Sequence, residues 1–125
     1  MLSVTTHIAP DAAPDPFNMA AHVLRNVDRL GDKVALSILH SDRSEDWTYS
    51  MLGQAVRGTA QGLLDMELHA GDRILLRLGN SADFPVAYLG CIAAGLIPVP
   101  LSTQLTTREV QQIAANIRPA ATIQS

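Results

Sequence analysis

The sequence contains a single cysteine, Cys91, and this scarcity excludes one class of protein at the outset. One cysteine cannot close an intrachain disulfide, so the chain is not a small disulfide-stabilised secreted domain, and it fits a reducing compartment. Cys91 stands within an apolar segment, which predicts a small buried hydrophobe and not a reactive thiol.

Lysine is equally scarce, because Lys33 stands alone beside eight arginines and the formal net charge is -3. No basic block is present, so a nucleic-acid partner is not expected. The N-terminus also lacks the basic start and apolar core of a signal peptide. We therefore expect a cytoplasmic location.

Side-chain patterns that carry chemistry are missing as well. The histidines stand apart from one another and from other metal ligands, which argues against a metal site; they are His7, His22, His40 and His69. The pairing of His69 with Asp65 or Asp72 is weak, and a surface helix end explains that histidine more simply. No glycine-flanked nucleophilic serine occurs, and Ser81 is expected to cap a helix. We predict no catalytic, cofactor-binding or metal-ligating residue in this chain.

The tripeptide Gly79-Asn80-Ser81 is the one candidate for phosphate binding. It stands between a predicted strand and a predicted helix, where backbone N–H groups and the helix dipole attract anions. The glycine fingerprint of dinucleotide-binding folds and the Gly-Lys-Ser/Thr phosphate loop are both absent. A plain strand-to-helix turn is therefore the expected role.

The stretch Gly71–Leu101 is the most informative part of the chain. Its pattern predicts a strand, a turn, a helix and a second strand in succession. A Gly-Asp turn signal opens the unit, and an apolar run follows at residues 74–78. Asn80 or Ser81 is expected to cap the helix, which has almost no polar face and should be buried on most sides. A glycine ends the helix, and a second buried strand is expected at residues 96–101.

A transmembrane helix is the alternative for this region, because no charged residue occurs between Phe84 and Thr107. Such a helix would contain Pro98 and Pro100, each of which costs about 3 kcal/mol relative to alanine. A buried helix followed by a strand avoids that strain, so no membrane span is predicted.

Further elements are predicted on both sides of this unit. Residues 1–16 show no hydrophobic periodicity and are expected to form a flexible lead-in. The other elements are a helix from its cap Asn18 to about Leu30, a hairpin of Val34–Leu39 and Glu45–Thr48, a helix from Thr48 or Ser50 to about Glu67, a helix that starts at the Thr106–Glu109 capping box and ends at Arg118-Pro119, and a strand at Ala120–Gln124. The long helix contains Gly53, Gly58 and Gly62, and close packing is expected to compensate for their low helix propensity.

This order of elements predicts an α/β fold, in which a layered α/β/α arrangement with a mostly parallel sheet follows an N-terminal β-hairpin. Residues 17–125 would form one α/β subdomain after the lead-in at residues 1–16. The chain stops just after a short strand while its apolar helices still need cover. We therefore expect an incomplete part of a larger domain.

Several stretches resemble the AMP-forming adenylating enzymes, the superfamily of acyl- and aryl-CoA synthetases, luciferases and peptide-synthetase adenylation domains. WTYSML at residues 47–52 resembles their early TY-x-E-L motif, and GCIAAGLIPVPL at residues 90–101 resembles their second core motif. The linking segments GDRI at 71–74 and LGNS at 78–81 match as well, as does the upstream strand at 34–36. Order and spacing agree from about Phe17 onward. Met51 replaces the usual glutamate, which affects only a helix cap.

The resemblance implies the N-terminal part of a longer enzyme, which joins a carboxylic acid to ATP, with Mg²⁺, as an acyl-adenylate and then passes the acyl group to coenzyme A. The family's phosphate loop, its adenine- and Mg²⁺-contacting motifs and its catalytic lysine lie further along and have no matching position here. Lys33 matches a non-catalytic position, and Arg73 and Arg77 lie within a strand. The amino-acid sequence at Phe84–Ala87 looks most like that of the acyl- and benzoate-type CoA ligases. The implied role is a scaffold segment that is inactive alone, holds no cofactor and can self-associate.

Two other classes stay open from the residues. A stand-alone, non-catalytic α/β binding or interaction module would fold as a stable monomer, whereas an isolated ligase segment would expose apolar helix faces. A small flavodoxin-like protein would bind nucleotide or flavin stoichiometrically.

Overall fold

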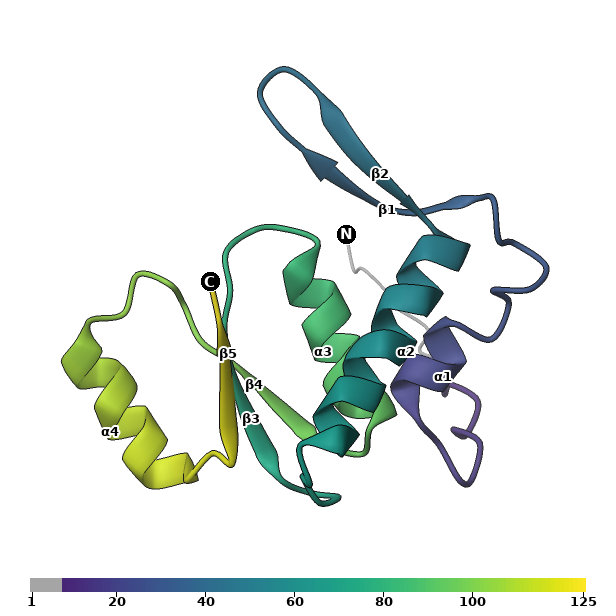
Figure 1. Ribbon diagram of the computed structural model, residues 1–125. Helices are drawn as coiled ribbons and strands as arrows, with labels where there is room; N and C mark the ends of the chain where they lie inside the picture. The colour runs from purple at the N-terminus through teal and green to yellow at the C-terminus, as the bar shows by residue number, and fades with distance from the viewer. Residues whose placement is uncertain (1–7) are drawn as a thin grey trace, which may run out of the picture.

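The computed structural model describes residues 8–125 as a three-layered α/β unit beside a projecting β-hairpin (Figure 1). The elements are α1 (Met19–Val23), β1 (Val34–Leu39), β2 (Ser44–Thr48), α2 (Tyr49–Asp65), β3 (Arg73–Arg77), α3 (Asp83–Ala93), β4 (Ile97–Pro100), α4 (Thr107–Ile117) and β5 (Ala121–Gln124). Helices α2 and α3 lie on one side of the sheet formed by β3, β4 and β5, and α4 lies on the other (Figure 1). The predicted α/β/α layering is confirmed.

The sheet has the strand order β4-β3-β5, and both pairings are parallel. The central strand β3 is buried on both faces, since Ile74, Leu75 and Leu76 are almost fully shielded from solvent. A strand covered on both sides has no place for polar residues, which explains its unbroken apolar run. The chain turns into β3 at Gly71, whose φ of 86° is readily adopted by glycine.

The main hydrophobic core lies between the sheet and the helices α2 and α3. Its buried members are Leu63, Ile74, Leu76, Ala87, Cys91 and Leu96. A second cluster joins α1 to the other side of α2 and α3, and there the side-chain amide of Asn18 donates to the carbonyl of Ile92 at 2.7 Å. Helix α3 is therefore packed on most sides, as its uniformly apolar sequence predicts.

The hairpin of β1 and β2 forms a separate two-stranded antiparallel sheet. It projects away from the layered unit (Figure 1), and of its side chains only Ile38 is buried. The pairing shifts register between Val34 and Leu36, which marks a bulge where the hairpin meets α2. The predicted N-terminal hairpin is confirmed.

The first helix is shorter than predicted. Asn18 does cap it, because its side-chain oxygen accepts from the N–H of Ala21 at 3.1 Å, but the helix ends at Val23 instead of Leu30. The following residues form turns with i→i−3 hydrogen bonds. The chain leaves the helical path so that the carbonyl of Gly31 can accept from the N–H of Ser50 at 3.1 Å. A contact between distant segments thus overrides the local apolar period.

The predicted cap of α3 is also wrong. The N-cap position is Ala82, which has no side-chain oxygen, and the helix starts at Asp83. Ser81 still contributes, since its Oγ accepts from the N–H of Asp83 at 3.3 Å. The turn is one residue longer than expected because Ala82 is buried and holds the helix start against the core.

The glycines of α2 behave differently from one another. An added Cβ on Gly53 would lie 3.1 Å from Val27 Cγ2, which confirms close packing at that position. Gly58 and Gly62 have no described atom within 4 Å of such a Cβ, so the packing explanation is wrong for them. A tight contact between helices does occur at Gly90 of α3, where an added Cβ would lie 2.6 Å from Thr59 Cγ2 of α2.

No helix within residues 8–125 is long and apolar enough to cross a membrane. The uncharged region that raised this alternative is divided between α3, which has 11 residues, and the strand β4.

Helix α4 starts with the capping box that the sequence predicts. Thr106 Oγ1 accepts from the N–H of Glu109 at 3.3 Å, and Glu109 Oε2 accepts from the N–H of Thr106 at 2.8 Å. Hydrogen bonds from the hydroxyl and the backbone N–H of Thr106 lower the pKa of Glu109 below its usual 4.5. The ionised carboxylate is therefore the form that caps the helix.

We expect the capping box to make folding stability depend on pH. A carboxylate whose pKa is lower in the folded than in the unfolded state stabilises the fold above its unfolded pKa and loses that contribution as pH falls through its folded pKa. The stability advantage of the natural chain over Glu109→Gln should therefore be present at neutral pH and shrink below about pH 4. Urea denaturation of both proteins across this range measures it. An advantage that grows on acidification would contradict the assignment, and in a Thr106→Ala background the pH dependence should become smaller.

Candidate functional site

The Gly79-Asn80-Ser81 turn lies at the carboxyl edge of the parallel sheet, where open α/β sheets commonly bind ligands. Ser81 Oγ donates to Asp83 Oδ2 at 3.3 Å, and Asp83 occupies the first turn of α3. A carboxylate at this helix N-terminus already uses the positive end of the dipole, so a phosphate would meet a like charge there. The geometry favours the plain strand-to-helix turn and gives Ser81 a structural role.

A hollow of about 290 Å³ lies beside this turn, between the ends of β3 and β5 and the start of α3. It is lined by Thr59, Leu78, Asp83, Val86, Ala87, Ile123, Gln124 and Ser125. Its one ionisable side chain is that of Asp83, and the remaining lining is neutral. The hollow therefore lacks the cation that a phosphate or carboxylate ligand needs.

The two arginines of β3 hold loops in place. Arg77 Nη2 donates to the carbonyls of Thr103 at 3.2 Å and Leu105 at 3.0 Å, and Arg73 Nη1 donates to the carbonyl of Ile117 at 3.2 Å. These bonds tie the central strand to both ends of α4. Both guanidinium groups donate to backbone oxygens, while Nε of Arg77 is buried without a hydrogen-bond partner among the described residues. The prediction that both arginines lie within a strand is confirmed.

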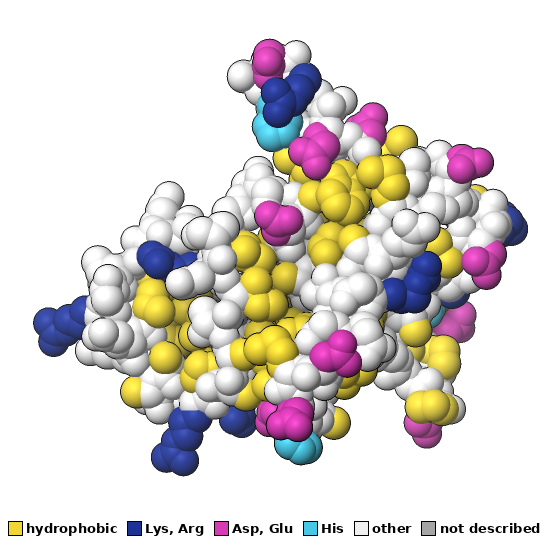
Figure 2. All heavy atoms as spheres, in the orientation of Figure 1, with side chains coloured by type: hydrophobic (Ala, Val, Ile, Leu, Met, Phe, Trp, Pro, Cys, Tyr) yellow, Lys and Arg dark blue, Asp and Glu magenta, His cyan; other side chains and the backbone are white. Residues whose placement is uncertain are grey.

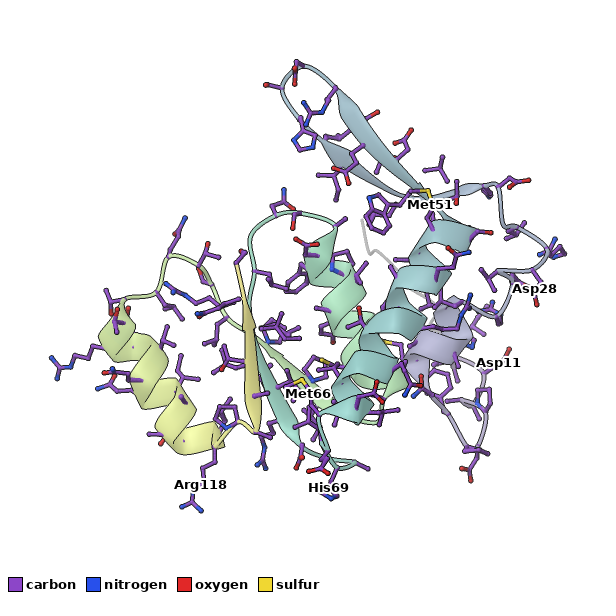
Figure 3. All side chains as sticks on the ribbon, viewed as in Figure 1. Asp11, Asp28, Met51, Met66, His69 and Arg118 are labelled. Atoms are coloured by element: carbon purple, nitrogen blue, oxygen red, sulfur yellow. The ribbon has the colours of Figure 1, made fainter. Side chains whose placement is uncertain are left out.

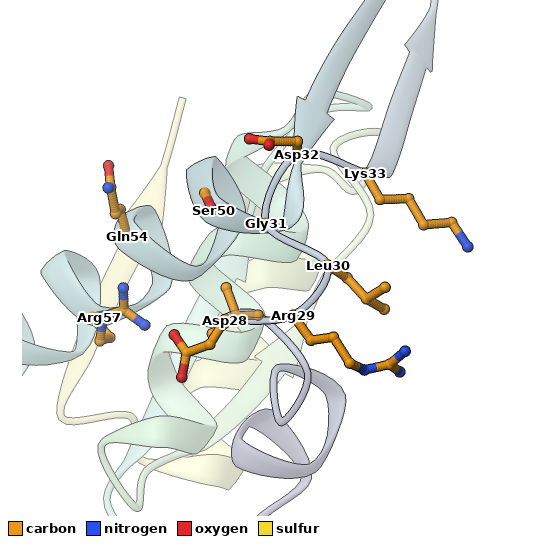
Figure 4. A pocket seen from close by; sticks show the side chains of 10 residues that line it. Asp28, Arg29, Leu30, Gly31, Asp32, Lys33, Ser50, Gln54 and Arg57 are labelled. Carbon is orange, nitrogen blue, oxygen red and sulfur yellow. The ribbon is translucent and has the colours of Figure 1, made fainter.

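A hollow of about 600 Å³ was not predicted from the sequence (Figure 4). It lies between the turns of residues 27–33 and the first half of α2, and its polar lining includes Ser50, Gln54 and Arg57. Asp28 points toward Arg57, whereas Arg29 and Lys33 extend to the opposite side (Figure 4). No local signal could have revealed it, because its two walls are distant in sequence. With charges of both signs, the hollow selects no single class of ligand.

Cys91 lies in the core, as predicted, and is fully buried. Burial raises the pKa of its thiol to about 11, because the interior disfavours the thiolate. The neutral thiol is not a nucleophile at neutral pH.

We expect Cys91 to resist thiol reagents while the chain is folded. A disulfide-exchange reagent at neutral pH should label the native protein at least about a hundred times more slowly than the protein in denaturant, since labelling must wait for opening of the core. The absorbance change on labelling gives both rates. Equal rates in the two conditions would show that the thiol is accessible in the native state.

The histidines do not form a metal site within residues 8–125, where no group of three or more His, Cys, Asp or Glu side chains could hold an ion. His40 Nε2 lies 3.7 Å from Glu45 Oε2 across the hairpin. His22 lies beside the ring of Phe17, with 5.4 Å between ring centroids, and the N–H of His69 donates to Asp72 Oδ2 at 2.8 Å. His7 lies outside the described residues.

The surface between α4 and α2 is largely apolar, and most charged side chains lie toward its periphery (Figure 2). Met51 and Met66 lie near the two ends of α2, and Arg118 and His69 point outward at the lower edge (Figure 3). Met66 is 61% exposed. An exposed apolar surface of this kind is suited to contact with another protein or with another part of the same protein.

Taken together, the described residues form a parallel α/β scaffold whose ionisable side chains cap helices, fix loops or face solvent. The chain belongs to the AMP-binding enzyme family, whose model matches residues 23–125. This match covers every element from β1 to β5.

Curated relatives include two aromatic-acid ligases. The chain is 30% identical over 105 residues to 4-coumarate–CoA ligase 2 of Petroselinum crispum, which covers 83% of this chain and 19% of that protein. It is 32% identical over 95 residues to 4-hydroxybenzoate–CoA/benzoate–CoA ligase of Rhodopseudomonas palustris, which covers 75% of this chain and 17% of that protein. The chain thus spans less than a fifth of the length of either relative.

Solved structures agree with this assignment. A benzoate CoA ligase from Burkholderia xenovorans LB400 superposes with a TM-score of 0.77 at 30% identity, covering 86% of this chain and 21% of that one. CmiS6 superposes with a TM-score of 0.79 at 24% identity, covering 93% of this chain and 28% of that one, and this likeness concerns the fold alone. The predicted α/β class and the resemblance to AMP-forming ligases are confirmed.

Proposed function

We propose that these 125 residues are the N-terminal part of a longer AMP-forming carboxylic acid–CoA ligase. In that reaction an acid carboxylate attacks the α-phosphorus of ATP, pyrophosphate leaves, and an acyl-adenylate forms. The thiol of coenzyme A then attacks the acyl carbon, forming a thioester and releasing AMP. The match of residues 23–125 to the AMP-binding enzyme family carries this proposal.

The partial coverage of the relatives supports the idea of a longer protein. Similar proteins are named as ligases of 4-coumarate, of 4-hydroxybenzoate or benzoate, and of medium-chain fatty acids. We therefore propose a small aromatic or fatty carboxylic acid as substrate class, with ATP, Mg²⁺ and coenzyme A as co-substrates and cofactor of the whole protein, in the cytoplasm. The division into a lead-in at residues 1–16 and a subdomain at residues 17–125 is part of the same proposal.

The described residues would serve this reaction as scaffold. In-line attack on a phosphate needs cations and a positioned acid. The described side chains do not fit the phosphates of ATP: Asp83 and Glu109 place negative charge in the first turns of α3 and α4, the helices that follow β3 and β4, and Arg73 and Arg77 are bound to backbone carbonyls. Within residues 8–125 no group of three or more His, Cys, Asp or Glu side chains could hold Mg²⁺. We propose that the 125-residue chain is inactive by itself.

Acid-dependent exchange between ATP and labelled pyrophosphate tests both parts of this proposal. The 125-residue chain should give no exchange with a panel of benzoates, cinnamates and fatty acids, while the native gene product should have several times the 13.4 kDa of this chain and be active with at least one acid. Exchange by the short chain would show that it holds its own catalytic groups. A native mass near 13.4 kDa would overturn the proposal of a longer ligase.

A further inference from the structure

The carboxyl ends of β3 and β4 form a topological switch point, a place where the connections that follow two neighbouring strands separate. The two strands are adjacent and parallel, so both end at the same edge of the sheet. The chain leaves β3 for α3 on one side of the sheet and leaves β4 for α4 on the opposite side (Figure 1). Open α/β sheets bind their ligands at such a point, between the loops that follow the two strands.

This switch point is internal to the sheet. The central strand β3 has β4 on one side and β5 on the other, so a further strand can join only at the outer edges. The adjacency of β3 and β4 is therefore independent of any residues beyond those described.

Arg77 stands at the switch point. It is the last residue of β3, and its half-buried side chain reaches the loop of residues 102–105 that follows β4. Its Nη2 donates to the carbonyls of Thr103 at 3.2 Å and Leu105 at 3.0 Å. Within residues 8–125 the other hydrogen bonds of this loop are local: the N–H of Gln104 donates to Ser102 Oγ at 3.2 Å, and the N–H of Leu105 donates to the carbonyl of Ser102 at 3.4 Å. Among the described residues, Arg77 is thus the side chain that ties the loop to the sheet.

The placement of Arg77 is unfavourable for stability alone. Its Nε is buried without a hydrogen-bond partner among the described residues, and a buried donor without a partner destabilises a fold. Local departures of this kind are expected where function decides the residue. Arg73 lies four residues earlier on the same face of β3 and makes a simpler contact, because it is exposed and its Nη1 donates to the carbonyl of Ile117 at 3.2 Å.

We propose that Arg77 is a positioning residue of the ligase, which holds the loop of residues 102–105 in the shape that borders a substrate at the switch point. This inference rests on the proposed ligase function. The guanidinium acts through the backbone of the loop and does not touch the reacting atoms. Its planar fork suits two carbonyls at once, whereas a methionine offers no donor and the compact ammonium of a lysine lacks the fork geometry.

Steady-state kinetics of the native gene product provide the test, once ATP–pyrophosphate exchange has identified its acid. Arg77→Met should lower kcat/KM for thioester formation by about ten- to a hundredfold, the effect of a small misplacement near a substrate. It should also raise KM for at least one of the acid, ATP and coenzyme A. A variant that only folds less well lowers the apparent kcat and leaves every KM unchanged, because its folded molecules are normal. Arg77→Lys should lie between the natural protein and Arg77→Met.

Arg73→Met is the matched control. It removes an arginine of the same strand that also bonds to one end of α4, but at the opposite edge of the sheet. This variant should keep every KM of the natural protein. Hydrogen exchange followed by mass spectrometry gives a second measurement that needs no activity: the amides of residues 102–106 should exchange faster in Arg77→Met and at the natural rate in Arg73→Met.

The outcomes separate this inference from the proposed function. Equal kinetic effects of Arg77→Met and Arg73→Met, or unchanged exchange of the loop amides in Arg77→Met, would overturn the positioning role and leave the ligase function intact. If Arg77→Met does not fold, Arg77→Lys carries the same comparison, and unchanged KM values in that variant would overturn the role. A natural gene product that is inactive with every acid would instead overturn the proposed function, and the positioning role with it.

Discussion

Gly90→Ala is expected to destabilise the folded chain by about 1–3 kcal/mol, the usual cost of overpacking a core contact. The added Cβ would lie 2.6 Å from Thr59 Cγ2 and 2.8 Å from Thr59 Cβ, both closer than real contacts allow. Thr59 belongs to α2, so the two longest helices of the core would have to move apart. The midpoint of urea denaturation, at an unchanged slope, measures the loss.

Gly58→Ala is the matched control, because it makes the same substitution at a helical glycine with open space around it. Alanine is the better helix former by about 1 kcal/mol, so this variant should be more stable than the natural chain. In the double variant Thr59→Ala with Gly90→Ala, the contact at 2.6 Å disappears and the one at 2.8 Å stays, so stability should return in part. Equal destabilisation by Gly90→Ala and Gly58→Ala would contradict the helix contact as the cause.

Leu76→Ala is expected to cost about 2–5 kcal/mol, the range for truncating a buried leucine. The side chain has no solvent exposure and lies in the main core with Leu63, Ala87 and Cys91. Its strand is at the centre of the sheet, so neighbouring strands on both sides limit the collapse of the cavity. Small domains have a total stability of about 5–15 kcal/mol. This substitution should therefore remove a large share of that stability.

Leu64→Ala on α2 gives the comparison for Leu76→Ala. Leu64 is 48% exposed, so truncating it leaves no closed cavity. Its effect on the free energy of unfolding should stay within about 0.5 kcal/mol, as is usual for surface substitutions. Thermal and urea denaturation of both variants measure the difference. A cost at Leu64 as large as that at Leu76 would place the core elsewhere.

Local sequence signals predicted most of the elements. The capping box of Thr106 and Glu109 has a fixed spacing and needs no tertiary partner, so it was found in full. The apolar run at residues 74–78 predicted a buried strand, and the apolar helix containing Cys91 predicted burial on most sides. The predicted length of the first helix was wrong, because the path of the chain after Val23 depends on a contact between distant segments, the hydrogen bond between Gly31 and Ser50.

The candidate site could be assessed from the sequence only in part. The strand-to-helix turn at residues 79–81 was located, because glycine and polar caps mark such turns, but Asp83 as the charge at the helix start was not considered. The polar hollow between residues 27–33 and α2 was missed, since its walls meet only through folding. The roles of Arg73 and Arg77 also needed the structure, because their partners lie 26–44 residues away.

By itself, the sequence determined the order and type of the elements and the burial of Cys91. These features follow from hydrophobic periodicity and turn residues, which act over a few neighbouring residues. The family was indicated separately, by the resemblance of motifs such as WTYSML to those of AMP-forming ligases. The tertiary structure alone decided that Gly90, and neither Gly58 nor Gly62, is where helices touch. It also decided the strand order β4-β3-β5, and with it that Pro98 and Pro100 lie on a strand paired with β3 alone among the described strands. Both decisions depend on which distant segments become neighbours, and no local pattern records that.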